Sequence, residues 1–233
     1  MDKEILWLIT ARAGSKSIKN KNIKLLNGIP LIEYRIKSAL SISKKENVWV
    51  STDSEEYASI AREAGATVPF IRPKKLSTDI ASSVDVVLHA MEYAKKSNKE
   101  FDYVGLLEPT SPFITSTQLN EAVGLLAENK EALAVVAVRE SRPHKIFIQK
   151  ESMFLEELFE NIKELNRVGR QEFEKEITPS GGFYISKWDA FIEKKSFYTS
   201  KTLSFEVDEI SGIEIDEPID WEFAEFIINK LNK

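Results

Sequence analysis

Short apolar runs and amphipathic segments alternate along the first half of the chain. Continuous apolar runs at residues 5–10, 48–52 and 103–107 are typical of strands covered on both faces of a parallel sheet. Helical spacing and helix-end signals predict helices at 30–43, 54–65, 82–96 and 116–129, and two further strands are expected at 67–71 and 133–138. This alternation predicts an α/β fold with an open, mostly parallel sheet flanked by helices.

The pattern changes after residue 138. Residues 139–176 are highly charged and less periodic, which predicts an insertion, and we place the inserted arm at 139–180. The remaining strands are expected at 182–186, 203–207 and 212–216, and the remaining helices at 187–193 and 218–231. We therefore expect a single domain over residues 1–233 that is interrupted by this arm.

Composition narrows the possible chemistry. The 233 residues include 32 Lys and Arg against 37 Asp and Glu, a formal net charge of −5, which disfavours a protein that mainly coats nucleic acid. Cysteine is absent and only two histidines occur, which excludes disulfides, thiolate ligands and cysteine nucleophiles and nearly excludes a multi-histidine metal site. The chain shows no export signal and no apolar stretch of about 20 residues, so we expect a cytoplasmic protein with no membrane partner.

A basic loop follows the first predicted strand. Residues 11–24 contain five cations and no acid. They lie at the sheet edge where open α/β proteins bind ligands. Gly14 and Ser15 can present backbone N–H groups, and Arg12, Lys16 and Lys21 can surround a polyanion. The alternative is a solvated basic turn. The loop lacks the glycine spacing of a P-loop and of a dinucleotide-binding fingerprint.

Two carboxylates near the C-terminus form a second candidate site. Glu214 and Asp216 are two residues apart on an expected strand, which would direct both side chains to one face. Such a pair could bind Mg²⁺, which takes one or two carboxylates together with phosphate oxygens and water. The alternative is a pair of edge-strand acids that only improve solubility.

Several motifs in order resemble the acylneuraminate cytidylyltransferase family. They are Ala-Arg-Ala-Gly-Ser-Lys from residue 11, Ser-Thr-Asp from 51, Leu-Ser-Thr-Asp from 76, Leu-Glu-Pro-Thr-Ser-Pro-Phe from 107, Gly-Phe-Tyr-Ile from 182 and Ile-Glu-Ile-Asp-Glu-Pro from 213. The resemblance implies a Rossmann-like sheet of the nucleotidyltransferase type with a dimerisation arm. It also implies transfer of CMP from CTP to the anomeric hydroxyl of a 2-keto-3-deoxy sugar acid of the sialic, legionaminic or pseudaminic type, with release of pyrophosphate.

The resemblance assigns nucleotide and metal roles to individual residues. The family positions imply nucleotide binding by Arg12, Ser15, Lys21, Asn22, Arg72 and Ser83. Arg12, Lys21 and Asp216 would be catalytic, and Asp216 and Glu214 would bind Mg²⁺. The base that removes the anomeric proton stays open between Asp216 and a metal-bound hydroxide. For Arg72 alone, a surface arginine is the alternative.

The resemblance also implies a sugar site and a homodimer. The implied sugar-binding residues are Glu108, Thr110, Ser111, Lys145, Arg170 and Tyr184, with Lys145 and Arg170 on the dimerisation arm. Family members usually carry Gln at the position of Glu108; an ionised Glu only accepts hydrogen bonds, so we expect it to meet sugar hydroxyls or an amino group. Thr110 and Ser111 could instead cap a helix, and Tyr184 could be a core aromatic. An eight-carbon Kdo-type substrate and a non-catalytic nucleotide-sugar binding module are the alternative functions.

Overall fold

A computed structural model describes residues 3–141, 147–149, 155–157 and 175–231. The chain divides into two compact units, one formed by Met1–Val138 with Pro179–Lys233 and the other by Arg139–Thr178. In the second unit, β7 (Phe147–Gln149) and β8 (Leu155–Glu157) form an antiparallel pair.

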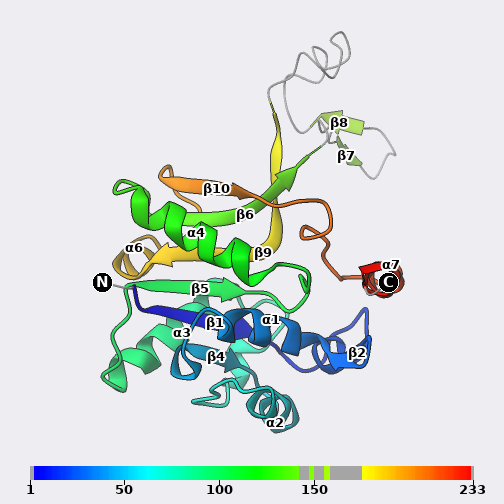
Figure 1. Ribbon diagram of the computed structural model, residues 1–233, viewed down its shortest axis with the longest axis horizontal. Coiled ribbons are helices and arrows are strands. Elements are labelled where there is room, and N and C mark those ends of the chain that lie inside the picture. The colour runs from blue at the N-terminus through cyan, green and yellow to red at the C-terminus, as the bar shows by residue number, and fades with distance from the viewer. Residues whose placement is uncertain (1–2, 142–146, 150–154, 158–174, 232–233) are drawn as a thin grey trace. The chain divides into compact units, whose positions relative to one another are not determined.

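A six-stranded sheet forms the centre of the first unit (Figure 1). The strand order is β10 (Thr202–Glu206), β6 (Ala134–Glu140), β9 (Ile177–Lys187), β5 (Tyr103–Leu107), β1 (Ile5–Thr10) and β4 (Val48–Ser51). β1 is parallel to β4 and β5, β10 is parallel to β6, and β9 is antiparallel to β5. At the start of β6, the Leu133 carbonyl accepts a hydrogen bond from Lys187 at the end of β9. Five strands therefore run in one direction and β9 runs against them, which confirms the α/β class and the mostly parallel sheet.

The two faces of the sheet are covered by different helices. On β1, Trp7 and Ile9 pack in one core cluster with residues of α1 (Leu31–Leu40), α2 (Glu55–Glu63) and α4 (Ser116–Glu128). Leu6 and Leu8 point to the other face and pack with α3 (Ser83–Lys96) and α6 (Trp188–Lys194). Because side chains alternate across a strand, an unbroken apolar run is needed to bury both faces. A third cluster packs α7 (Pro218–Leu231) against the first turn of α1.

Two expected strands are wrong. Residues 67–71 make only single bridges from Thr67 to Trp49 and from Ile71 to Thr52. Pro69, between them, has no N–H group to donate to a ladder. Residues 212–216 are likewise not a strand. The Ile215 N–H donates to the Thr110 carbonyl and the Asp216 N–H donates to the Asp220 carboxylate, so the backbone of this segment is satisfied outside a ladder.

A short hairpin between the basic loop and α1 was not predicted. β2 (Leu25–Leu26) and β3 (Ile29–Pro30) form a hairpin joined by Asn27 and Gly28, both with positive φ. Asn-Gly is the preferred sequence for the two-residue turn that matches the twist of a hairpin. The part of the chain that the structure describes contains no helix long and apolar enough to cross a membrane.

Candidate active site

A pocket of about 520 Å³ opens at the carboxyl ends of β1 and β5. It is lined by Thr10 at the end of β1, by Glu108 directly after β5 and by Ser83 at the start of α3. Of the residues that the sequence singled out, the following line it: Arg12, Ser15, Lys21, Asn22, Arg72, Ser83, Glu108, Thr110, Glu214 and Asp216. Ser111 and Tyr184 do not, and Lys145 and Arg170 lie outside the described residues.

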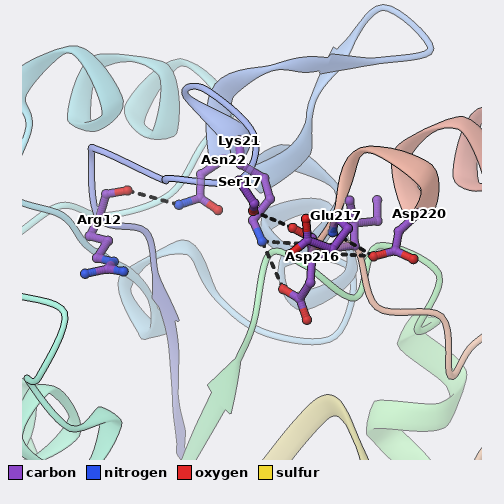
Figure 2. A network of polar contacts seen from close by, with 8 residues as sticks. Arg12, Ser17, Lys21, Asn22, Asp216, Glu217 and Asp220 are labelled. Atoms are coloured by element: carbon purple, nitrogen blue, oxygen red, sulfur yellow. Dashed lines mark hydrogen bonds and ion pairs between the residues drawn. The ribbon is translucent and has the colours of Figure 1, made fainter.

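Hydrogen bonds to buried polar groups fix the basic loop after β1. The Asp53 carboxylate, which follows β4, accepts a hydrogen bond from the Ala13 N–H at 2.9 Å. Asn22 is buried and its amide donates to the Arg12 carbonyl at 3.2 Å (Figure 2). The loop is thus held through its backbone, while the Arg12 guanidinium lines the pocket and pairs there with the Asp79 carboxylate at 2.6 Å.

Lys21 joins this loop to a segment almost 200 residues later. Its Nζ donates to the Ile215 carbonyl at 2.8 Å and to the Asp216 carboxylate at 3.0 Å, and the lysine side chain is only 12% exposed. The Ser17 hydroxyl donates to the Asp216 carbonyl, and the Asp220 carboxylate accepts from the backbone N–H groups of Asp216 and Glu217 (Figure 2). These contacts, and not a strand, place Asp216 in the pocket.

Arg72 is a buried cation with unused donors. It is 5% exposed, and among the described residues its Nε and Nη2 atoms have no hydrogen-bond partner. Burial lowers the pKa of its guanidinium, Asp53 acts in the opposite direction, and Arg12 adds to the lowering. Because unsatisfied buried donors are costly, an anion in this pocket would gain unusually strong hydrogen bonds from Arg72.

Glu108, Glu214 and Asp216 form what we call the acidic part of the pocket. Burial, followed by the charges of Glu214 and Asp216, raises the pKa of Glu108 to about 7, while Lys21 acts in the opposite direction. Glu108 and Glu214 both approach Gly181 on β9, which has a φ of +62°. A Cβ atom there would lie 2.6 Å from Glu214 Oε2 and 3.2 Å from Glu108 Oε2. Sequence reasoning missed Gly181, although the Gly181–Gly182 pair marks a close approach of backbone and side chains.

Thr110 and Ser111 form a tight turn and do not cap α4. The Ser111 N–H donates to the Glu108 carbonyl, and the Ser111 hydroxyl is buried with no partner among the residues that the structure describes. The cap of α4 is Thr115, which forms a reciprocal capping box with Gln118. The helix-cap alternative for Thr110 and Ser111 is therefore wrong.

Tyr184 lies beside the acidic part of the site on the opposite face of β9 from Phe183. Its ring packs against Phe197 at 5.5 Å and against Tyr198 at 6.1 Å between ring centroids. Burial and then the charge of Glu108 raise the pKa of its hydroxyl. Tyr184 thus combines a packing role with electrostatic proximity to Glu108.

Arg35 is a second buried cation that the sequence did not reveal. It lies on α1, is fully buried, and donates to the Ile114 carbonyl at 2.8 Å and to the Gly182 carbonyl at 3.3 Å. Burial lowers the pKa of its guanidinium to about 9. Arg35 therefore fixes the backbone of β9 directly beside Gly181.

Comparison with known proteins relates the whole chain to one family. Residues 6–225 match the family model described as cytidylyltransferase. The chain is 34% identical over 235 residues to the N-acylneuraminate cytidylyltransferase of Escherichia coli O18:K1:H7, with 100% of this chain and 54% of that protein covered. It is also 34% identical over 227 residues to the CMP-N,N'-diacetyllegionaminic acid synthase of Legionella pneumophila, with 95% and 94% covered. The chain thus spans about half the length of the E. coli relative and nearly all of the Legionella one.

A solved structure shares the fold. The CMP:2-keto-3-deoxy-manno-octonic acid synthetase complexed with CTP has a TM-score of 0.69 over 98% of this chain and 99% of that chain, at 16% identity. This likeness concerns the fold alone. The sequence relatives confirm the resemblance that the ordered motifs indicated. The matched family model and these relatives together show that the chain belongs to the cytidylyltransferase family.

Proposed function

We propose that this cytidylyltransferase transfers CMP from CTP to the anomeric hydroxyl of a nonulosonic acid of the sialic, legionaminic or pseudaminic type. The products are a CMP-sugar and pyrophosphate. The observation that carries the proposal is one pocket whose lining combines several cations with several carboxylates. The names of the similar proteins from E. coli and Legionella support the class of sugar acid. Consumption of CTP further suggests action in the cytoplasm.

The cations suit the triphosphate of CTP. Arg12, Lys21 and Arg72 line the pocket, and two nitrogens of the buried Arg72 find no acceptor in the part of the chain that the structure describes. Displacement at the α-phosphorus needs positioning and charge stabilisation more than a covalent nucleophile. Fixed cations in a partly buried pocket provide both, because they need little rearrangement as charge moves toward the leaving pyrophosphate.

The acidic residues fit a bound Mg²⁺. Among the described residues, no group of three or more His, Asp or Glu side chains is assembled as a metal site. However, Glu214 and Asp216 line the pocket, and their negative charge helps to raise the pKa of Glu108. A divalent cation would relieve this repulsion, and carboxylate oxygens are the donors that Mg²⁺ prefers. Asp216 and Glu214 would hold the ion, which when bound would neutralise phosphate oxygens. Lys21 fixes the Asp216 carboxylate for this role.

The sugar would bind at the acidic part of the pocket. We propose that Glu108 and Thr110 contact sugar hydroxyls and that Tyr184 and Ser111 shape the adjoining surface. We also propose that the unit Arg139–Thr178 joins two copies of the chain, and that Lys145 and Arg170 of this unit contact the sugar carboxylate. A guanidinium and an ammonium group suit that anion.

A pyrophosphate-release assay tests the proposal. Purified protein is given CTP, Mg²⁺ and, in separate reactions, C8 and C9 2-keto-3-deoxy sugar acids. We expect pyrophosphate release with at least one C9 acid, and loss of release in Lys21→Met. Release with only a C8 acid would favour the Kdo-type alternative. Binding of CTP and sugar without release would favour the non-catalytic module, and release only with UTP and another sugar would overturn the proposal.

A further inference from the structure

Two cations of the pocket already hold an anion that belongs to the chain itself. The Asp79 carboxylate pairs through Oδ1 with Arg12 Nη1 at 2.6 Å and through Oδ2 with Lys16 Nζ at 2.6 Å. All three residues line the pocket. Hydrogen bonds from Lys16 and Arg12 hold the pKa of Asp79 below its ordinary value. Each carboxylate oxygen therefore engages one cation, in the way that two oxygens of a phosphate group would.

The segment that carries Asp79 can leave the pocket without exposing the core. Asp79 lies between the short helix η3 (Lys74–Leu76) and the start of α3, and its side chain is 49% exposed. The neighbouring Ile80 is 94% exposed, so it contributes almost nothing to the packing of the loop. Moving Asp79 away breaks two exposed ion pairs, which are individually weak.

We propose that Asp79 is an internal competitor for the phosphates of CTP, a positioning residue that holds Arg12 and Lys16 until a polyphosphate displaces it. This inference rests on the proposed function. A triphosphate carries several negative charges, whereas the carboxylate carries one. The triphosphate therefore displaces Asp79 from Arg12 and Lys16. When pyrophosphate departs, Asp79 can return to Arg12 and Lys16, which weakens the hold on this product. Asp79 thereby sets the affinity for CTP and favours pyrophosphate release.

Calorimetric titration of Asp79→Asn tests the competition. CTP, inorganic pyrophosphate and cytidine are titrated into the full chain at fixed ionic strength. Removal of two exposed ion pairs should tighten binding of CTP and pyrophosphate by about 3- to 10-fold. Binding of cytidine, which carries no phosphate, should not change. Equal or weaker binding of CTP by Asp79→Asn would overturn the inference.

A matched variant separates this effect from a general change in charge. Glu92→Gln on α3 also removes one negative charge and one exposed ion pair, with Lys96 at 2.6 Å, but Glu92 does not line the pocket. We expect its affinity for CTP to stay within about 1.5-fold of the wild type, since Glu92 pairs with Lys96 outside the pocket and salt screens exposed charges. The same tightening in Glu92→Gln and Asp79→Asn would contradict a specific competition.

Movement of the loop can be followed directly because the chain contains no cysteine. Ile80→Cys provides a single site for an environment-sensitive fluorophore at an exposed position. CTP should change the emission when Asp79 is present and change it much less in the Asp79→Asn background. An unchanged signal at saturating CTP would contradict displacement of Asp79. If the wild type does not bind CTP, the proposed function fails as well; if it binds and Asp79→Asn binds no tighter, only this inference fails.

Discussion

Replacing Gly181 by alanine adds a single Cβ atom next to the carboxylates of Glu214 and Glu108. The φ of +62° at Gly181 favours glycine, and an L-residue there costs about 1 kcal/mol. The new Cβ would lie 2.6 Å from Glu214 Oε2 and 3.2 Å from Glu108 Oε2. These atoms are the ends of flexible side chains, so they can turn away at little cost in folding free energy. For a chain of 233 residues we expect the melting temperature to fall by about 2–4 °C.

The effect on activity should be much larger than the effect on stability. To reach an ordinary contact distance of about 3.5 Å, the Glu214 carboxylate must move by roughly 1 Å. A misplacement of that size near reacting groups can lower the rate by about 100-fold. The assay measures kcat for pyrophosphate release beside the thermal unfolding of the same preparation. Wild-type kcat in Gly181→Ala would refute the argument that the positions of Glu108 and Glu214 matter for the reaction.

A glycine in α4 supplies the matched control. Nothing lies within 4 Å of a Cβ atom built on Gly124, and Gly124 does not have a positive φ. Alanine is favoured over glycine inside a helix by about 0.5–1 kcal/mol. Gly124→Ala should therefore raise the melting temperature slightly and leave kcat unchanged. A comparable loss of activity in both variants would show that the assay reports on general damage to the protein.

Three further variants test the raised pKa of Glu108, the role of Lys21 in the reaction and the contribution of Arg35 to stability. Burial beside Glu214 and Asp216 raises the pKa of Glu108 from 4.5 to about 7, so in the absence of Mg²⁺ the stability that this acid contributes is present below pH 4.5 and is lost as pH rises to about 7. Glu108→Gln should not show this loss. Between pH 4.5 and pH 8, the free energy of unfolding in urea should fall by up to about 3 kcal/mol more in the wild type than in the variant. Equal pH profiles of the two proteins would contradict the raised pKa of Glu108. Lys21→Met should lower kcat for pyrophosphate release by at least about 100-fold, because it removes a proposed triphosphate ligand and the ion pair that holds Asp216. A loss of less than 10-fold would argue against both roles of Lys21. Arg35→Met removes the side-chain donor to the Ile114 and Gly182 carbonyls, so it should lower the free energy of unfolding in urea by about 2–4 kcal/mol. An unchanged urea midpoint would show that the buried guanidinium does not contribute to stability.

Local sequence patterns predicted those elements whose structure depends on burial of consecutive residues. β1 and β5 were predicted because every residue of each strand packs into the core except Thr10 at the end of β1. Residues 67–71 were mistaken for a strand because apolar content outweighed the missing N–H of Pro69. The strand expected at 212–216 failed for a different reason. Its conformation depends on Thr110 and Lys21, which are distant in sequence, and on Asp220 in the helix that follows.

The site was predictable only in part. A cation-rich loop directly after β1 indicated a polyanion pocket because the ends of parallel strands form the ligand-binding edge. The contacts between Asp79 and Arg12, between Asp53 and Ala13, and around Gly181 arise from tertiary packing that no local spacing encodes. The assignment of Glu214 and Asp216 to one pocket was right in position but not in its reason, since no strand aligns them.

³¹P nuclear magnetic resonance of the complete reaction distinguishes transfer of CMP to the sugar acid from hydrolysis of CTP. With CTP, Mg²⁺ and an accepted nonulosonic acid, the three CTP signals should decay together. A phosphodiester signal from the CMP-sugar and a pyrophosphate signal should grow in equal molar amounts. Without the sugar acid, CTP should persist. Formation of CMP or inorganic phosphate in place of the phosphodiester, or decay of CTP that does not depend on the sugar acid, would contradict the account.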